Sequence, residues 1–137
     1  MKKLLVKSLT AALFAATALS LSAEPALLGN KSLSGQTLDG QSAKAVLMGK
    51  KVAIGDTRVI IVIAKTGAAQ EAFLQSHVGM TTSQFQNHWR RLFMTGGGTA
   101  PKVVATEADA LKLAAETPGA VVAADSASAG DLAVLTK

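Results

Sequence analysis

An uninterrupted apolar run in the middle of the chain constrains the fold more than any other feature. Residues 57–64 read Thr-Arg-Val-Ile-Ile-Val-Ile-Ala, without the alternation of polar and apolar side chains that a half-exposed strand shows. Such β-branched runs are typical of a strand in a parallel sheet, where helices cover both faces. Shorter apolar runs at residues 103–104, 120–123 and 132–135 indicate further strands.

Four segments between these strands have the apolar periodicity of helices. The first two are residues 41–48 and 68–78. A third helix begins near Thr81 or Ser83, since each has Gln three residues later, and the fourth is residues 106–116. Strands alternating with helices predict an α/β layer structure. The side chains expected to face its core are Ala43, Val46, Leu47, Ala69, Ala72, Phe73, Ser76, Phe85, Trp89, Leu92, Phe93, Ala108, Leu111, Ala114 and Ala115.

The first 23 residues have the layout of a secretory signal peptide. Three lysines in the first seven residues precede an apolar stretch, residues 9–19, and small residues follow it at positions 20, 22 and 23. The eleven residues of that stretch are too few to cross the hydrocarbon core of a bilayer, which takes roughly 20. A membrane anchor or a buried core helix is therefore the less favoured alternative. We expect cleavage after a residue between 20 and 23, and one exported, soluble periplasmic domain over residues 24–137.

The positive charge of the chain is spread out rather than concentrated. The full sequence carries 14 Lys and Arg against nine Asp and Glu, a net charge of +5, and three of the lysines belong to residues 1–23. Eleven basic and nine acidic residues remain after cleavage, a net charge of +2, and no run of cations exceeds two. A nucleic-acid-binding protein needs a concentrated basic surface, often with aromatic side chains for stacking. Nucleic acid is therefore not an expected partner.

The sequence contains no pattern of a common catalytic or metal site. It has no cysteine, which excludes disulfides, thiolate zinc sites, iron–sulfur clusters and cysteine nucleophiles. It has no Gly-x-Ser-x-Gly elbow, and no serine or threonine has an evident base. The two histidines, His77 and His88, are better explained as surface residues than as metal ligands. We therefore expect no enzyme, no cofactor and no metal; an envelope hydrolase is the least supported alternative.

Four stretches, taken in order along the chain, match the pattern of one known family. Residues 43–50 read Ala-Lys-Ala-Val-Leu-Met-Gly-Lys, and residues 71–74 read Glu-Ala-Phe-Leu. Residues 88–101 read His-Trp-Arg-Arg-Leu-Phe-Met-Thr-Gly-Gly-Gly-Thr-Ala-Pro, and residues 117–120 read Thr-Pro-Gly-Ala. Together they resemble the small periplasmic proteins related to the phosphate-binding proteins of ABC transporters. The resemblance runs from about residue 33 to residue 135 and implies a three-layer α/β fold, a single lobe similar to the second lobe of a type 2 periplasmic binding protein.

The resemblance also implies where a ligand would bind. In the phosphate binders, a Ser-Gly-Thr loop opens the helix after the buried strand, and its hydroxyls and backbone N–H groups hold the anion. The corresponding ligand-binding residues here are Lys65, Thr66, Gly67, Ala68 and Ala69.

The family's anion-binding side chains are absent from this loop. Its serine falls on Gly67, its threonine on Ala69, and its arginine near Ile63. Lys65 and Thr66 are the neighbouring groups that could replace them. The alternative interpretation is an ordinary strand-to-helix turn in which Gly67 permits the bend.

Two further candidates for anion binding have simpler explanations. Residues 96–99, Gly-Gly-Gly-Thr, could approach a phosphate with their backbone, but a helix end is the better interpretation. Arg90 and Arg91 are expected on the solvated side of the third helix rather than in a phosphate clamp.

The expected function is that of an exported solute-binding-protein-like module for phosphate or a similar small anion. Its partner would be an ABC transporter or another envelope protein. The alternative is an accessory or interaction protein of the cell envelope that kept the fold without binding a ligand. The ligand, the partner and the oligomeric state stay open from the sequence.

Overall fold

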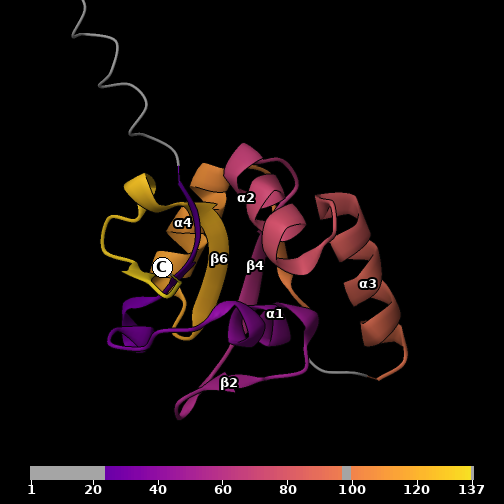
Figure 1. Ribbon diagram of the computed structural model, residues 1–137, viewed down its shortest axis with the longest axis horizontal. Helices are drawn as coiled ribbons and strands as arrows, with labels where there is room; N and C mark the ends of the chain where they lie inside the picture. The colour runs from indigo at the N-terminus through magenta and orange to yellow at the C-terminus, as the bar shows by residue number, and fades with distance from the viewer. Residues whose placement is uncertain (1–23, 97–99, 137) are drawn as a thin grey trace, which may run out of the picture.

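A five-stranded sheet forms the middle layer of the computed structural model, which describes residues 24–96 and 100–136 (Figure 1). The expected signal peptide, residues 1–23, lies outside the described residues. The strands of this sheet are β1 (Pro25–Gly29), β4 (Ile60–Ala64), β5 (Lys102–Val104), β6 (Ala120–Asp125) and β7 (Ala133–Val134). Their order across the sheet is β5-β4-β6-β1-β7.

The centre of the sheet is parallel, as the apolar run predicts. β4 pairs in parallel with β5 on one side and with β6 on the other. β1 lies between β6 and β7 and pairs antiparallel with both of them. The three-layer α/β fold expected from the sequence is confirmed by this sheet and by the helices on its two faces.

The expected strand at residues 57–64 is divided in the structure. Its first part, β3 (Thr57–Arg58), forms a separate hairpin with β2 (Ala53–Ile54). The division falls at Val59, whose N–H donates to the carbonyl oxygen of Val52 at 2.9 Å and so holds the chain in the hairpin. β1 and β2 were not expected from the sequence.

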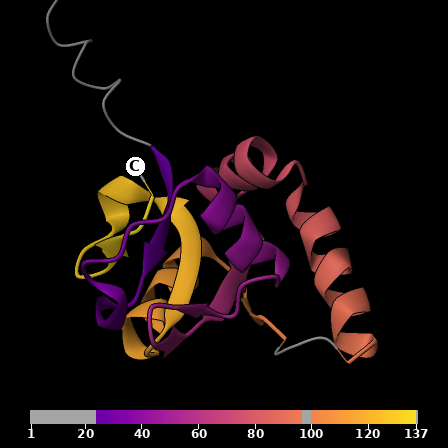
Figure 2. The ribbon, with the colours of Figure 1, turned by 60° about the horizontal axis from the view of Figure 1, so that its bottom comes forward.

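Helices cover both faces of the sheet (Figure 2). One face carries α1 (Gly40–Met48), α2 (Ala68–Phe73) with its continuation η3 (Leu74–Val78), and α3 (Thr82–Met94), and its core is built around Phe73, Phe85 and Trp89. The other face carries α4 (Glu107–Glu116), which packs Ala110 and Ala114 on Val62 and Val122. Two short 3-10 turns complete the chain: η2 (Lys31–Leu33) and η4 (Ser126–Ser128).

The ends of three helices follow the predicted chemistry. The capping box of α3 belongs to Thr81, not Ser83: Thr81 Oγ1 accepts from the N–H of Gln84 at 3.1 Å, and Gln84 Oε1 accepts from the N–H of Thr81 at 2.9 Å. Thr106 caps α4 by accepting from the N–H of Asp109. Gly49 ends α1 with φ at +86°, and a Cβ there would collide with the ring of Trp89.

The buried sides of the helices agree with the expectation in α1 and differ in the others. α1 buries Ala43, Val46 and Leu47 as expected. In the segment 68–78 the α-helix becomes a π-helix at Leu74, which turns Val78 inward in place of Ser76. Before this change, Gln70 is held inward by its hydrogen bonds to Ala64. That segment buries Gln70, Phe73, Leu74 and Val78 in place of Ala69, Ala72 and Ser76.

Two further expectations about buried side chains were wrong. Phe93 is 55% exposed, because the last turn of α3 lies beside β5, the short edge strand of the sheet. Ala108 and Ala115 are exposed, and α4 turns Ala110 inward instead. Alanine fits both sides of a helix, so the alanine-rich sequence of α4 does not fix its phase.

Candidate functional site

The carboxyl ends of the parallel strands form the expected ligand side of this sheet. From the end of β4 the chain leaves toward β5, whereas from the end of β6 it leaves in the other direction, toward β7. In open α/β sheets the crevice between two such strands is the usual place for a ligand. The loop that the sequence predicts as the site, residues 65–69, starts at this point of the sheet.

The five predicted residues lie together at the end of β4 and the start of α2. Lys65 and Thr66 are exposed, the N–H of Lys65 donates to the carbonyl oxygen of Val104, and Thr66 Oγ1 donates to the carbonyl oxygen of Ala105 at 3.3 Å. Gly67 is the residue before α2, and Ala68 and Ala69 form its first turn. The loop is therefore tied to the neighbouring strand and open to solvent.

The start of α2 offers backbone donors without a side-chain cap. The first helical hydrogen bond runs from the N–H of Glu71 to the carbonyl oxygen of Gly67 at 3.0 Å. The N–H groups of residues 68–70 therefore point out of the helix end, where they carry a partial positive charge. Gly67 itself provides no side chain to satisfy them.

Glycine is not required at position 67 by the backbone. Its φ is 166°, an extended conformation that any residue adopts. A Cβ there would make ordinary contacts, at 3.6 Å from Oε1 of Glu107 and 3.7 Å from Cβ of Gln70. The bend therefore does not depend on glycine, and the alternative of an ordinary strand-to-helix turn stays a prediction.

Glu107 is the neighbour of the loop that sequence reasoning missed. It is the first residue of α4 and half-buried, and its Oε2 accepts from the N–H of Asp125 at 3.3 Å. The carboxylate thus lies between the end of β6 and Gly67. Glutamate is common in the first turn of a helix, so its position in the sequence does not single it out. Only the sheet topology places it beside residues 65–69.

The rim around the loop is acidic on its β6 side. The carboxylate of Asp125 accepts from the N–H groups of Glu24 and Ala127, each at 3.0 Å. Glu107 is next to it, and Lys65 is the cation that the loop itself contributes. A doubly charged anion at the start of α2 would thus meet backbone donors and Lys65 on one side and carboxylates on the other.

Gln70 lies where the pairing of β4 with β6 ends, and it was also missed. It is 2% exposed, and its side-chain amide pairs with both backbone groups of Ala64. A polar residue in a helix is expected on the surface from its type alone. The apolar periodicity of the sequence therefore predicts an exposed Gln70, which is wrong. Its burial makes the floor of the candidate site a polar amide rather than an apolar side chain.

Two carboxylates near helix ends have lowered pKa values. Hydrogen bonds from Thr82 and then from Gln75 hold the pKa of Glu71, one turn after the loop, below its ordinary value of 4.5. The hydrogen bond from the N–H of Ser42 lowers the pKa of Asp39, the N-cap of α1. Both carboxylates act as acceptors at helix starts and are positioned for structure.

The remaining candidates lie away from the loop. His77 is exposed and stacks on Phe73 with ring centroids 4.1 Å apart, and a ring nitrogen of His88 lies 3.1 Å from the carbonyl oxygen of Met48. Arg90 and Arg91 are exposed on α3, as expected. The glycine triplet at 96–98 reaches the undescribed residues 97–99, and Thr95 with Gly96 ends α3. Within residues 24–96 and 100–136, no three His, Asp or Glu side chains are grouped to hold a metal ion.

A solved structure with a similar fold comes from a binding protein. It is an X-ray structure, with phosphate bound, of a protein from Clostridium perfringens assigned as a phosphate ABC transporter substrate-binding protein. The TM-score is 0.61 at 13% sequence identity, and the match covers 83% of this chain and 44% of that one. The chain thus spans less than half the length of that binding protein, and the similarity concerns the fold.

Other comparisons add no family. No protein-family model matches the sequence, and no curated protein is significantly similar to it. In the part of the chain that the structure describes, no helix is long and apolar enough to span a membrane. The structural comparison therefore supports a fold like one lobe of a periplasmic binding protein.

Proposed function

We propose that the protein is an exported solute-binding-protein-like module that holds phosphate or a similar small oxyanion at residues 65–69. The observation that carries this proposal is the position of the loop. It begins at the carboxyl end of the central strand β4, at the point of the sheet where the chain directions of β4 and β6 diverge. The similar fold of a solved phosphate-binding protein supports the same assignment.

The anion would be held mainly by backbone groups. The N–H groups of residues 68–70 point out of the start of α2. Lys65 adds a flexible ammonium group. The hydroxyl of Thr66 donates to the carbonyl oxygen of Ala105, so it would join the anion only by giving up that hydrogen bond. Gly67 and Ala69 supply no hydroxyls, so we expect affinity below that of a site with a full set of side-chain donors.

Export to the periplasm and an ABC transporter or other envelope protein as partner belong to the same proposal. They rest on the pattern of residues 1–23 and on the nature of the structural neighbour. The matched region covers 44% of the neighbour, so the domain described here would form one wall of a closed cleft.

A second candidate function has a specific observation in its favour. The carboxylate of Glu107 lies next to Gly67, where it repels an anion at the loop. This favours an envelope accessory or interaction protein that keeps the fold and binds no ligand at residues 65–69. The two functions differ in one measurable property, the stabilisation of the folded chain by phosphate.

Thermal unfolding of the purified protein with phosphate, sulfate or chloride at equal ionic strength separates them. A ligand present at 100 times its dissociation constant adds about 2.7 kcal/mol to the free energy of unfolding. We expect phosphate to raise Tm beyond chloride, and Lys65→Gln to reduce the rise. Lys44→Gln, an exposed lysine of α1, is the matched control. Equal Tm in all three salts at millimolar concentration would reject anion binding and favour the accessory function.

A further inference from the structure

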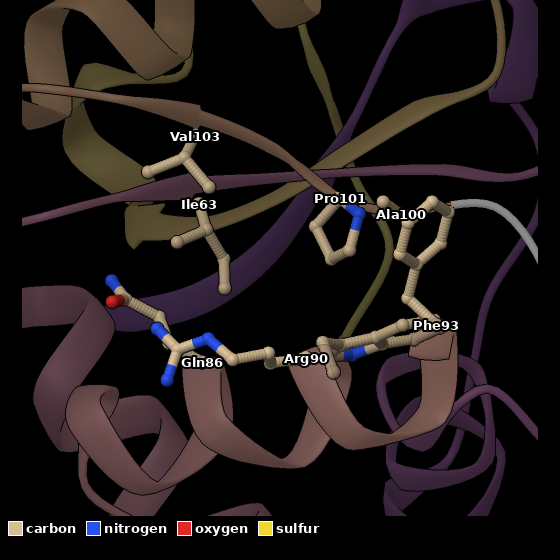
Figure 3. Close-up of a pocket in the computed structure, with 8 residues that line it drawn as sticks. Ile63, Gln86, Arg90, Phe93, Ala100, Pro101 and Val103 are labelled. Carbon is tan, nitrogen blue, oxygen red and sulfur yellow. The ribbon is translucent and has the colours of Figure 1, made fainter. Parts of the chain in front are cut away.

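A hollow of about 200 Å³ lies between α3 and the edge strand β5, apart from the loop at residues 65–69 (Figure 3). It opens toward solvent and shares no residue with that loop. Six of the eight residues that line it are apolar or aromatic: Ile63, Trp89, Phe93, Ala100, Pro101 and Val103.

The walls of this hollow expose apolar surface. Phe93 is 55% exposed and Val103 is 50% exposed, although both are large apolar side chains. Trp89 lies behind them and is held in place, because its Nε1 donates to the carbonyl oxygen of Leu47 at 2.9 Å. An apolar cavity with a fixed aromatic wall is the usual setting for a small organic ligand.

One end of the hollow is cationic. Gln86 and Arg90 lie one turn apart on α3, and their polar groups come together at the end away from Phe93 (Figure 3). The guanidinium of Arg90 donates one hydrogen bond, to Oδ1 of Asn87 at 2.8 Å, and a guanidinium has five N–H donors. No carboxylate is among the described residues that line the hollow.

We propose that this hollow binds a small monocarboxylate with an apolar body, such as an arylacetate. The carboxylate pairs with Arg90 and Gln86, and the apolar body covers Trp89, Phe93 and Pro101. The size fits, since a dry cavity of about 150 Å³ accepts a single benzene ring and this hollow is somewhat larger and open. Phosphate is excluded because the apolar lining would remove its hydration without replacing the lost hydrogen bonds.

A peptide strand added to β5 is the alternative occupant, and the geometry disfavours it. Val104 turns its carbonyl oxygen toward β4, where it accepts from the N–H of Lys65. The direction of the backbone N–H and C=O groups alternates along a strand. In this three-residue strand, Val103 is therefore the residue whose N–H and C=O point away from β4, toward the free edge. One residue gives too few hydrogen bonds to hold an extended peptide.

Trp89 makes the proposal directly measurable. It is the single tryptophan of a chain without tyrosine and it lines this hollow, so its fluorescence should respond to a ligand bound there. Phenylacetate should change the emission of Trp89 in a saturable way, with a dissociation constant of about 1 mM for a ligand of this size. Phenylacetamide, which has the same ring and no charge, should bind about tenfold more weakly, and acetate should give no saturable change.

Two neighbouring arginines of α3 provide the matched variants. Arg90→Gln should weaken phenylacetate binding about tenfold and remove the preference over phenylacetamide, because the charged donor is lost. Arg91→Gln should bind as the unchanged protein does, since Arg91 does not line this hollow. Thermal unfolding of both variants checks that they fold, and ligand-observed NMR provides a second binding readout.

The proposal is overturned if phenylacetate gives no saturable signal by either readout. It is also overturned if phenylacetamide binds equally well, or if Arg90→Gln and Arg91→Gln weaken binding to the same extent. Phosphate is titrated separately, since its effect tests residues 65–69 and leaves this hollow unaffected.

Discussion

The side-chain amide of Gln70 pairs with Ala64 at two points, like a strand partner. Its Oε1 accepts from the N–H of Ala64 at 2.9 Å, and its Nε2 donates to the carbonyl oxygen of Ala64 at 2.8 Å. The pairing of β4 with β6 ends at Val62 and Val122, two residues before Ala64. Gln70 therefore satisfies the backbone groups that β6 no longer reaches, beside the candidate site.

Gln70→Leu should lower the free energy of unfolding by about 3 kcal/mol, because both buried backbone groups of Ala64 lose their partner. Urea denaturation measures the change. Gln75→Leu is the matched control, since Gln75 is exposed and its side chain bonds to Glu71 only at the surface. That control should stay within about 0.5 kcal/mol of the unchanged protein. Equal losses in the two variants would contradict the role assigned to Gln70.

Gly119→Ala should destabilise the protein by more than about 3 kcal/mol. Gly119 precedes β6 with φ at +80°, and a Cβ there would overlap the carbonyl oxygen of Arg58. Gly79 has nearly the same φ, +82°, but open space around its Cβ position. Gly79→Ala should therefore cost only the conformational strain, about 1 kcal/mol. A comparable loss in both variants, measured by urea denaturation, would show that the overlap with Arg58 is relieved cheaply.

The stability of the protein should fall in acid partly through Glu71. Its pKa is lowered in the folded state by hydrogen bonds from Thr82 and Gln75, so the unfolded chain binds the proton more readily. The stabilisation is therefore complete above the ordinary pKa of 4.5 and is lost as the pH falls through the lower folded value. Urea denaturation between about pH 3 and about pH 6 should show a weaker pH dependence for Glu71→Gln than for Glu116→Gln. Identical profiles would contradict this assignment.

Much of the fold is predictable because apolar runs and capping residues act locally. The β-branched run at 60–64 identifies the central strand, and the spacing of Thr81 and Gln84 identifies the start of α3. β1 escapes prediction because its five residues, Pro-Ala-Leu-Leu-Gly, have no alternation and are flanked by turn-forming residues. Its place between β6 and β7 comes from pairing with residues about a hundred positions away.

The candidate site is predictable only in part for the same reason. The resemblance identifies residues 65–69, which are contiguous in the chain. Glu107 and Gln70 come close to this loop only through tertiary structure. Glu107 lies at the start of α4, and Gln70 lies in α2, the helix that continues as a π-helix. No local pattern distinguishes a glutamate that faces a ligand loop from one that only stabilises a helix start.

The carboxylate of Glu107 provides the sharpest test of the candidate anion site. Replacing it by the neutral amide in Glu107→Gln removes a negative charge beside Gly67 and keeps the size of the side chain. If residues 65–69 hold an oxyanion, the affinity for phosphate should rise about tenfold, as expected for one nearby like charge in a partly hydrated site. The gain should shrink at high ionic strength because salt screens exposed charges. Calorimetric titration with phosphate at low and high salt measures both effects.

Gly67→Ser should then raise the affinity again in the Glu107→Gln background, because a serine hydroxyl would supply the donor that the resemblance to phosphate binders implies at this position. The extended φ of Gly67 accepts a serine without strain. In the unchanged background the new hydroxyl has a competing acceptor, since Oε1 of Glu107 lies 3.6 Å from the position of the added Cβ. Serine alone should thus help less than serine together with Glu107→Gln.

Asp109→Asn, an exposed change in the first turn of α4, is the control for the charge lost in Glu107→Gln. If it raises phosphate affinity as much as Glu107→Gln does, the effect is one of net charge, and residues 65–69 are not the site.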